Sequence, residues 1–512
     1  MATKLLFLLP IAILIVISTF CLWKYLPGIK PLDYGLTIDA GSSHSEVILY
    51  TWSDKVNGTG HARQLSSVEV SNGIDDHGED IESTVNELYN AVASAVDQIP
   101  EGVLGPFPLF LGATAGIRIL NLTKPELVDE IMSSINTNLS NSDFNGRSLD
   151  VKQVRILSGS EEGLYAWVTV NYLLNSLEDD STAQPDEMDT LGMLDMGGAS
   201  SQIAYQINET NENKNDQSVN SVSLFGKNYT VKSHSNLCFG SDQGYTRYLF
   251  ELVRRHFDNT EIEKDSADNS SSIRSIKIRD PCNHDSPVEM HRGTEFTSNP
   301  CLKTLSTYDL ENTEITFEPS MNHSKCASVI IDLIDQSYCE QHYALCPTSE
   351  SDPAPLKTHF YAISSYYYST KVLPSIQNGG DVFHNDTDYL HQVNHWCTTP
   401  WVEKVQLADP KYARYLCFKQ LYIYYTLKTI YQFTDDQWPY IHFRNKIRDS
   451  SLGWSLGYMI TETNIIPSKP VKPVIWSKYA SFGSLGLLAA VMIFLTAYWI
   501  GRRSKSADIN HA

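Results

Sequence analysis

Residues 191–202 read Leu-Gly-Met-Leu-Asp-Met-Gly-Gly-Ala-Ser-Ser-Gln, an apolar run that ends on an aspartate, two glycines and two hydroxyls. Residues 34–43 repeat this order, with β-forming residues, Asp39, a glycine-containing turn and two serines. Glycine lets the backbone turn sharply with its N–H groups facing one concavity, in which a phosphate can bind. An aspartate at a strand end can hold a hydrated divalent cation, because hard cations prefer oxygen ligands. The repeat therefore predicts two lobes that grip one polyphosphate.

Two further segments lie between these loops. Residues 112–118 read Gly-Ala-Thr-Ala-Gly-Ile-Arg, and residues 158–167 read Ser-Gly-Ser-Glu-Glu-Gly-Leu-Tyr-Ala-Trp. Either one alone is an ordinary turn or helix start, since acidic residues are common in a first helical turn. In this order, however, the four segments resemble the apyrase conserved regions of the ecto-nucleoside triphosphate diphosphohydrolases, and the resemblance covers most of residues 34–467.

The resemblance implies an α/β, two-lobed fold of the actin, hexokinase and Hsp70 (ribonuclease H-like) type, with lobe I at residues 24–157 and 443–475 and lobe II at 158–442. Local patterns fit such a fold. Apolar residues recur every three or four positions over 81–99, which predicts a helix that Pro100 ends, and residues 106–111 read as a strand. The polar stretches 206–223 and 257–300 read as surface loops or insertions.

The resemblance also implies the catalytic residues. By this resemblance, Glu162 would be the base that activates a water molecule, and Ser200 and Gln202 would orient that water. Asp39 and Asp195 would hold Ca²⁺ or Mg²⁺ through bound waters. A carboxylate suits this task, because water is a poor nucleophile until a base accepts its proton.

The substrate-binding residues that the resemblance implies are Ser42, Ser43, His44, Thr114, Ala115, Gly116, Gly197, Gly198, Ala199 and Tyr368. Of these, Tyr368 would stack on the nucleobase, since an aromatic face accepts any base. Residues 426–429 lack the arginine that relatives place on the other side of the base. Arg118 would support the phosphate loop or pair with a carboxylate, and Glu161 would be structural.

Two stretches are long and uncharged, residues 5–23 and 480–500. At 1.5 Å per residue each can cross a hydrocarbon core of about 30 Å. The first is long for the apolar part of a signal peptide and has no clear cleavage site, which favours an uncleaved anchor. Basic residues after the second span predict a cytoplasmic tail at 501–512, and hence a cytoplasmic N-terminus at 1–4. The two spans can also mediate homo-oligomer formation.

The region between the spans carries the signs of an extracytoplasmic domain. One of the nine cysteines, Cys21, lies in the first span, and an even number confined to one region suits disulfides in an oxidising compartment. A zinc site would need Cys-x-x-Cys spacing, which is missing. Eight cysteines allow 105 pairings; the resemblance implies Cys238 to Cys301, Cys282 to Cys326, Cys339 to Cys346 and Cys397 to Cys417. The glycosylation sequons are Asn57, Asn121, Asn138, Asn208, Asn228, Asn269, Asn322 and Asn385.

Length and charge narrow the function further. A chain of 512 residues is too long for one ordinary core and indicates two domains. Its formal charge of -21 argues against nucleic acid as a partner, and an anionic polyphosphate would need a metal ion to offset the repulsion.

We therefore expect a metal-dependent ecto-apyrase that removes phosphate stepwise from nucleoside tri- and diphosphates. It would lie in the cell membrane with an extracellular catalytic region, or alternatively in the Golgi membrane with that region in the lumen. Two other classes remain: a kinase of the same superfamily, and a surface receptor that binds nucleotides without hydrolysing them. The joint presence of the five implied catalytic and metal residues favours the enzyme.

Overall fold

The computed structural model describes residues 32–467, except 54, 72, 75–79, 104, 178–189, 209–215, 260–273, 304–309 and 349–357, together with 490 and 493–501. The chain divides into one compact unit, Tyr34–Pro467, and a second unit made of Met1–Asp33 and Ser468–Ala512. The expected span at 5–23 lies outside the described residues, as does much of 480–500. Within the described ranges, no helix is both long enough and apolar enough to cross a bilayer.

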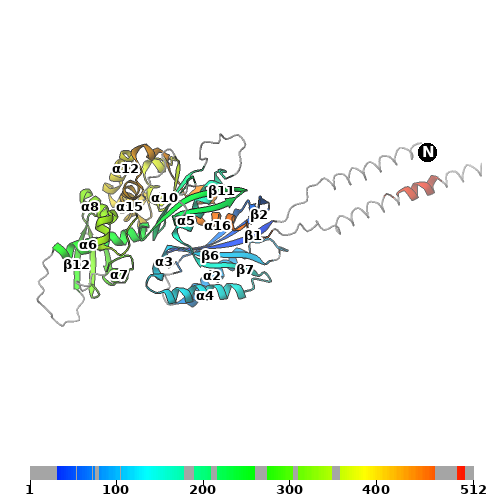
Figure 1. Ribbon diagram of the computed structural model, residues 1–512, viewed down its shortest axis with the longest axis horizontal. Helices are drawn as coiled ribbons and strands as arrows, with labels where there is room; N and C mark the ends of the chain where they lie inside the picture. The colour runs from blue at the N-terminus through cyan, green and yellow to red at the C-terminus, as the bar shows by residue number, and fades with distance from the viewer. Residues whose placement is uncertain are drawn as a thin grey trace, which may run out of the picture. The chain divides into compact units, whose positions relative to one another are not determined.

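The first sheet of the compact unit has five strands (Figure 1). Their order is β5 (Arg63–Val70), β2 (Ser45–Trp52), β1 (Asp33–Ala40), β6 (Phe107–Ala113) and β7 (Leu149–Ile156). The last three run parallel, so the loops that follow them open at the same edge. Two amphipathic helices, α2 (Ile81–Val96) and α4 (Pro125–Asn141), bury their apolar faces against this sheet. The predicted helix at 81–99 and strand at 106–111 are thus confirmed within a few residues.

The second sheet has six strands in the order β10 (Val219–Leu224), β11 (Lys227–Leu237), β9 (Ser200–Gln206), β8 (Gly192–Met196), β15 (Phe360–Ser364) and β16 (Ile441–Phe443). β8, β15 and β16 run parallel, whereas β8, β9 and β11 form an antiparallel meander. The stretch 191–202 therefore supplies β8, a tight turn and the start of β9.

Two helices, α5 (Gly159–Leu173) and α16 (Trp454–Glu462), fill the space between the sheets (Figure 1). Both are apolar around most of their circumference, as expected for helices with no face toward water. They cross closely at Gly457, whose amide donates to Thr169 Oγ1 at 2.8 Å. A Cβ on Gly457 would overlap the carbonyl oxygen of Tyr165, so the crossing requires glycine at this position.

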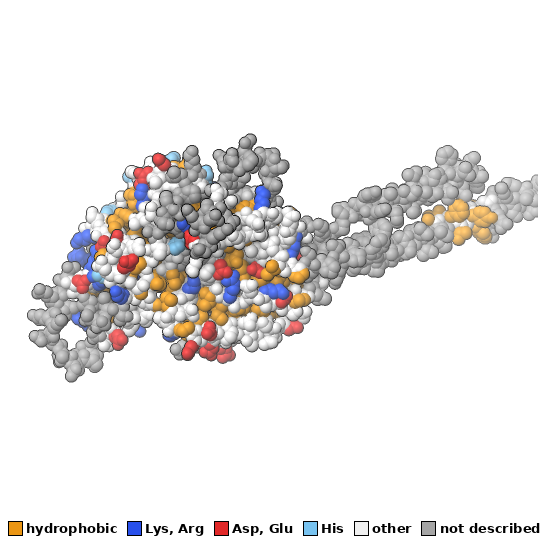
Figure 2. All heavy atoms as spheres, viewed as in Figure 1, with side chains coloured by type: hydrophobic (Ala, Val, Ile, Leu, Met, Phe, Trp, Pro, Cys, Tyr) orange, Lys and Arg blue, Asp and Glu red, His pale blue; other side chains and the backbone are white. Residues whose placement is uncertain are grey.

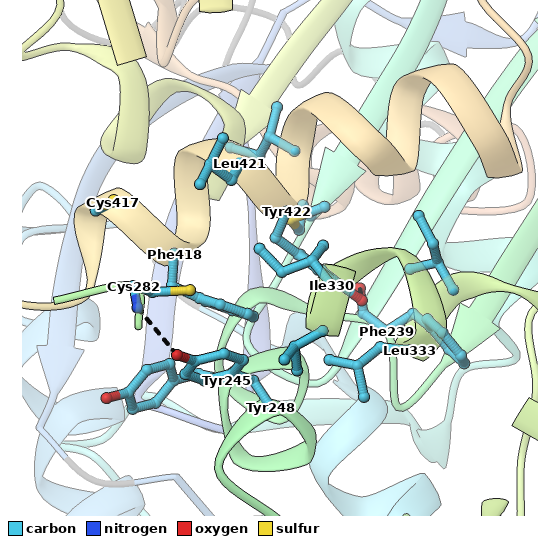
Figure 3. Packing of buried hydrophobic residues seen from close by; sticks show 14 of the residues in the cluster. Phe239, Tyr245, Tyr248, Cys282, Ile330, Leu333, Cys417, Phe418, Leu421 and Tyr422 are labelled. Atoms are coloured by element: carbon cyan, nitrogen blue, oxygen red, sulfur yellow. Dashed lines mark hydrogen bonds between the residues drawn. The ribbon is translucent and has the colours of Figure 1, made fainter. Parts of the chain in front are cut away.

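The outer face of the second sheet carries the largest core cluster, to which α6 (Ser241–Asn259), α8 (His323–Ile334), α12 (Asp386–Thr398) and α15 (Leu416–Tyr425) contribute. Figure 3 shows Phe418 of α15 packed close to Tyr245 and Tyr248 of α6. A small sheet of β12 (Arg274–Asp280), β14 (Thr313–Pro319) and β13 (Glu289–Arg292) lies beyond them. The expectation of loops over 206–223 and 257–300 was therefore wrong where β10, β12 and β13 form.

Four disulfides stabilise this region, and they are the pairs that the resemblance implies: Cys238–Cys301, Cys282–Cys326, Cys339–Cys346 and Cys397–Cys417. The shorter elements are α3 (Ala115–Asn121), α7 (Thr294–Thr297), α9 (Gln336–His342), α10 (Ser365–Thr370), α11 (Pro374–Gln377), α13 (Trp401–Leu407), α14 (Pro410–Ala413), a π-helical turn (Thr426–Ile430), a 3-10 helix (Asp435–Tyr440), β3 (Lys55–Val56), β4 (Thr59–Gly60), β17 (Lys446–Ile447) and β18 (Ser450–Ser451). On the face shown in Figure 2, acidic and basic side chains both reach the surface.

Candidate active site

A cleft of about 410 Å³ lies where strand ends of the two sheets face each other. Its walls come from the segments that follow β1, β6, β8 and β15 and from residues 445 and 451–454. Binding at the carboxyl ends of parallel strands is general for α/β folds. The predicted site residues that line it are Asp39, Ser42, Ser43, His44, Thr114, Ala115, Glu162, Asp195, Gly197, Gly198, Ala199, Ser200 and Tyr368.

Two predicted residues lie behind the cleft wall. Gly116 is buried in the first turn of α3, and Gln202 is fully buried next to Ser200. The structure thus brings thirteen of the fifteen predicted catalytic, substrate and metal residues to one surface. Gln202 lies behind that surface and donates a hydrogen bond to Ser200, which lines it.

The two glycine-containing loops face each other across the cleft. A Cβ on Gly198 would lie 3.0 Å from Ser42 Oγ, so the loop after β8 approaches the loop after β1. Gly41 is required by the turn itself, because a Cβ there would lie 2.7 Å from the His44 carbonyl oxygen. The carbonyls of Gly197 and Gly198 accept hydrogen bonds from the first amides of α6, which fixes the second loop. Two fixed loops with small side chains leave room for a phosphate chain between them.

Glu162 enters the cleft from the first turn of α5. The helix starts after Ser158, whose hydroxyl accepts the Glu161 amide, while the Glu161 carboxylate accepts the Ser158 amide. Arg155 Nη1 contacts the other oxygen of Glu161 at 2.8 Å. Glu161 therefore caps the N-terminus of α5, whereas the side chain of Glu162 takes no part in the cap and lines the cleft.

Glu162 belongs to a polar network made of Arg118, Glu162, Ser200 and Gln202. Arg118 Nη2 donates to Glu162 Oε2 at 2.5 Å and to Ser200 Oγ at 3.2 Å. Gln202 Nε2 donates to Glu162 Oε2 at 3.2 Å and to Ser200 Oγ at 2.6 Å. Ser200 and Gln202 lie on the same face of β9 because side chains alternate along a strand. The network holds Oε2 of Glu162, and Glu162 lines the cleft.

Three of the carboxylates that line the cleft, Asp39, Glu162 and Asp195, have raised pKa values. Burial raises the pKa of Glu162 to about 7; Arg118 opposes that rise and the negative charge of Asp195 adds to it. Burial raises the pKa of Asp195 to about 6, and the neighbouring hydroxyl of Ser364 opposes that rise. The carboxyl group of Asp39 is surrounded by protein although the residue borders the cleft, and burial followed by the charge of Glu162 raises its pKa well above the usual range.

These carboxylates suit a cation. Asp195 is only 6% exposed and its Oδ1 has no hydrogen-bond partner among the described residues, which is costly for a buried carboxylate. A hydrated divalent ion between Asp39 and Asp195 would satisfy that oxygen and offset the mutual repulsion. Over the described ranges, no group of three or more His, Cys, Asp or Glu side chains is arranged to hold a metal. The residues fit the expected binding by two carboxylates through water.

Among the lining residues that were not predicted as site residues, Trp454 and Ser364 lie beside the two aspartates. Trp454 is buried but lines the cleft; its indole lies beside Asp39 and lowers the pKa of that carboxyl, although its N–H is outside hydrogen-bond geometry. Ser364 ends β15 with a φ of 56°, which a non-glycine residue seldom adopts, and its side chain lies close enough to Asp195 to lower the pKa of that carboxyl. Its signal in the sequence is a polar residue at the end of an apolar strand.

Tyr368 lies at the open end of the cleft with 53% of its surface exposed. Its ring contacts Tyr367 edge-on, and Lys371 Nζ lies 5.5 Å from the ring centroid. Lys428, in the segment that lacks the expected arginine, is paired with Asp386 and Asp435 instead. Tyr368 thus presents a flat apolar face with a cation on one side.

The sequons are distributed over the surface of the compact unit. Asn269 lies outside the described residues. Asn138 is half-buried, whereas Asn57, Asn121, Asn208, Asn228, Asn322 and Asn385 are exposed.

Comparisons with known proteins agree with this geometry. A profile described as the GDA1/CD39 (nucleoside phosphatase) family matches residues 30–475. The chain is 32% identical over 497 residues to ectonucleoside triphosphate diphosphohydrolase 1 of Bos taurus, covering 93% of this chain and 90% of that protein. It is 29% identical over 488 residues to the Mus musculus protein of the same name, covering 92% and 90%. A crystal structure of nucleoside triphosphate hydrolases from Neospora caninum matches with a TM-score of 0.57 at 15% identity, covering 85% of this chain and 93% of that one. The α/β two-lobed, actin-like fold is thereby confirmed.

Proposed function

The chain belongs to the GDA1/CD39 nucleoside phosphatase family, and on that premise we propose that it hydrolyses nucleoside tri- and diphosphates stepwise to the monophosphate and inorganic phosphate. The observation that carries this proposal is the position of Glu162. Its carboxylate faces the space between the two phosphate loops and is held there by Arg118 and Gln202.

The proposed reaction is attack of water on the terminal phosphorus. Glu162 accepts the proton of the water while its hydrogen bond from Gln202 keeps it oriented. Ser200 lies within reach of the same water, because Arg118 and Gln202 hold its hydroxyl at the cleft surface. The water oxygen forms the new P–O bond, the bond to the bridging oxygen breaks, and the shortened nucleotide leaves with that oxygen.

A bound Ca²⁺ or Mg²⁺ would supply the positive charge that neutralises the phosphate oxygens. Asp39 and Asp195 are the residues that would hold it, through water. The amides of the two glycine-containing loops and the hydroxyls of Ser42, Ser43 and Thr114 line the same space and would bind the remaining phosphate oxygens. Gly116 would act only by shaping the turn after β6. Tyr368, with Lys371 beside it, would stack on the base.

The test is phosphate release from ATP and from ADP, in Mg²⁺ or Ca²⁺ and in excess chelator, on membranes that carry wild-type protein or Glu162→Gln. Glu162→Gln should lower kcat by about a hundredfold or more, because it removes the base without changing the shape of the site. Glu161→Gln is the matched control: glutamine can keep the helix cap, so release should stay close to wild type.

The two outcomes separate the enzyme from a receptor. Metal-dependent release from both nucleotides that only Glu162→Gln abolishes supports the apyrase. Nucleotide binding without release, in wild type as well, would overturn the proposal in favour of a non-hydrolysing receptor.

We further propose that the catalytic region is extracytoplasmic, that residues 5–23 and 480–500 anchor it, and that these spans mediate self-association. The four disulfides support this location, because such bonds persist in oxidising compartments. We also propose lobe boundaries at 24–157 with 443–475, and at 158–442; in support, the first sheet lies within the former ranges and the second sheet, apart from Phe443, within the latter.

A further inference from the structure

A second pocket, of about 440 Å³, shares no lining residue with the active-site cleft. It forms where β11 runs past the start of β10: the Ser233 amide donates to the Ser218 carbonyl at 2.7 Å, and residues 216–218 then turn away. We call it the rear pocket. Its lining includes Arg118, Gly159, Ser160, Asp216, Lys232 and Ser235.

The charge of the rear pocket differs from that of the chain as a whole. Two cationic side chains, Arg118 and Lys232, line it in a chain with a formal charge of -21. Lys232 is only 8% exposed, so its charge acts with little screening by water. Among the described residues of the lining, Asp216 is the one carboxylate; its Oδ1 accepts the Ser218 amide at 2.9 Å, and the charges of Lys232 and His234 help to lower its pKa. The balance favours an anion.

Hydrogen-bond donors without a partner also favour an anion in the rear pocket. Gly159 and Ser160 form the first turn of α5, a fifteen-residue helix, where amides lack partners within the helix and the dipole favours negative charge. Arg118 Nε has no hydrogen-bond partner among the described residues. A small tetrahedral oxyanion matches a pocket of hydroxyls, amides and two cations.

Arg118 links the rear pocket to the catalytic residues. Its Nη2 holds Glu162 and Ser200, as described above. Its Nη1 lies next to Gly159 and Ser235, which line the rear pocket: a Cβ on Gly159 would overlap both Arg118 Nη1 and Ser235 Oγ. Ser235 Oγ in turn accepts from Gln202 Nε2 at 3.2 Å. An anion in the rear pocket would therefore compete with Glu162 for one guanidinium group.

We propose that the rear pocket binds inorganic phosphate and that its occupancy slows hydrolysis through Arg118. This inference rests on the proposed function, under which phosphate is a product, so the pocket gives the enzyme a feedback site for that product. Phosphate bound there draws the guanidinium away from Glu162 and Ser200, while the nucleotide cleft stays open.

The binding test uses the full-length protein in detergent with saturating Mg²⁺ and a non-hydrolysable ATP analogue to fill the cleft. Inorganic phosphate is then titrated, and Tm is followed, since a ligand of the native state raises Tm. In Lys232→Met, the phosphate concentration for the half-maximal Tm rise should increase about tenfold or more, as one charge-assisted hydrogen bond is lost. Lys227→Met, at the exposed start of the same strand, should behave as wild type.

Asp216→Asn changes the affinity in the opposite direction. Asp216 is exposed, and asparagine can keep its turn with Ser218, so this variant should fold and bind phosphate severalfold more tightly. It keeps the inference testable even if Lys232→Met does not fold. No Tm rise with the cleft filled, or an equal rise in all four proteins, would overturn the inference.

Kinetics test the coupling. In wild type and Lys227→Met, phosphate should lower kcat with little change in KM for the nucleotide. In Lys232→Met this inhibition should be lost, while the kcat measured in the absence of phosphate should equal that of wild type. Purely competitive inhibition would overturn the coupling. A protein that hydrolyses no nucleotide but shows the Lys232-dependent Tm rise would refute only the proposed function, whereas hydrolysis without that rise would refute only the rear-pocket site.

Discussion

The proton on Glu162 sets the pH at which the proposed reaction runs. A base works only when ionised, and burial raises the pKa of Glu162 to about 7. We expect kcat/KM for ATP to rise with unit slope below about pH 7 and to level above it, because kcat/KM reports the free protein. Glu161→Gln should give the same profile, since Glu161 lies in the helix cap. A profile that stays flat from about pH 5.5 to about pH 8.5 would exclude Glu162 as the base.

When no cation is bound, ionisation of Asp195 should lower the free energy of unfolding. Its folded pKa of about 6 lies above the usual value of 3.8, so the folded state binds the proton more tightly and stability falls as pH rises from about 4 to about 6. At pH 8 in chelator, Asp195→Asn should therefore be more stable than wild type by on the order of 2 kcal/mol, as judged by chemical denaturation.

Two controls belong to the Asp195→Asn experiment. Near or below about pH 3 the two proteins should unfold alike, because wild-type Asp195 is then largely protonated in both the folded and the unfolded state. Saturating Mg²⁺ at pH 8 should raise the Tm of wild type and leave that of Asp195→Asn almost unchanged. A variant that is less stable than wild type in chelator would show that Asp195 is not an unpaired buried charge.

The catalytic residues differ in how far the sequence reveals them. Asp39 and Asp195 could be found from the repeated order of strand, aspartate and glycine turn. Glu162 needed the family resemblance, because a glutamate in a first helical turn usually has a purely local role. Ser364 and Trp454 were missed since their positions depend on strand pairing and helix packing between distant segments.

The crossing of α5 and α16 fixes the geometry of the cleft, because α5 carries Glu162 and α16 begins at Trp454. Gly457→Ala would place a methyl group against the backbone of Tyr165. We expect a loss of stability of at least about 2 kcal/mol and a fall in kcat, measured by denaturation and phosphate release.

Gly453→Ala is the control for that helix. Gly453 has an extended φ of 172° and nothing within 4 Å of an added Cβ, so its unfolding free energy should stay within about 0.5 kcal/mol of wild type. If Gly457→Ala were equally harmless, the two helices would not pack as closely as described.

Elements with a strong apolar period were predictable. The helix α2 and the strand β6 follow directly from spacing and from Pro100. The strand β12 was hidden in a polar stretch, although Ile276 and Ile278 alternate with charged residues and face the core. Composition outweighed that short alternation, because three buried residues give little periodic signal.

The arrangement of the two sheets lay beyond local pattern. The second sheet places β15 and β16 beside β8, although more than 160 residues separate β8 from β15 along the chain. Nothing in the spacing of apolar residues specifies such pairing, so the two-lobed fold was expected only through the family resemblance. The same resemblance implied the four disulfides, whose partners are 63, 44, 7 and 20 residues apart.

The location of the whole protein can be tested on living cells. Disulfides and exposed sequons on one compact unit predict that this unit lies on the extracytoplasmic side of the membrane. If that side is the cell exterior, intact cells expressing the protein should release phosphate from added ATP, which does not cross the membrane, and Glu162→Gln cells should not. A glycosidase should also lower the mass of the protein, because the exposed asparagines would carry glycans.

Release that appears only after permeabilisation, with glycans present, would place the protein in the Golgi membrane. Release only after permeabilisation with no glycans would put the catalytic region in the cytosol, where its four disulfides would not be expected to persist.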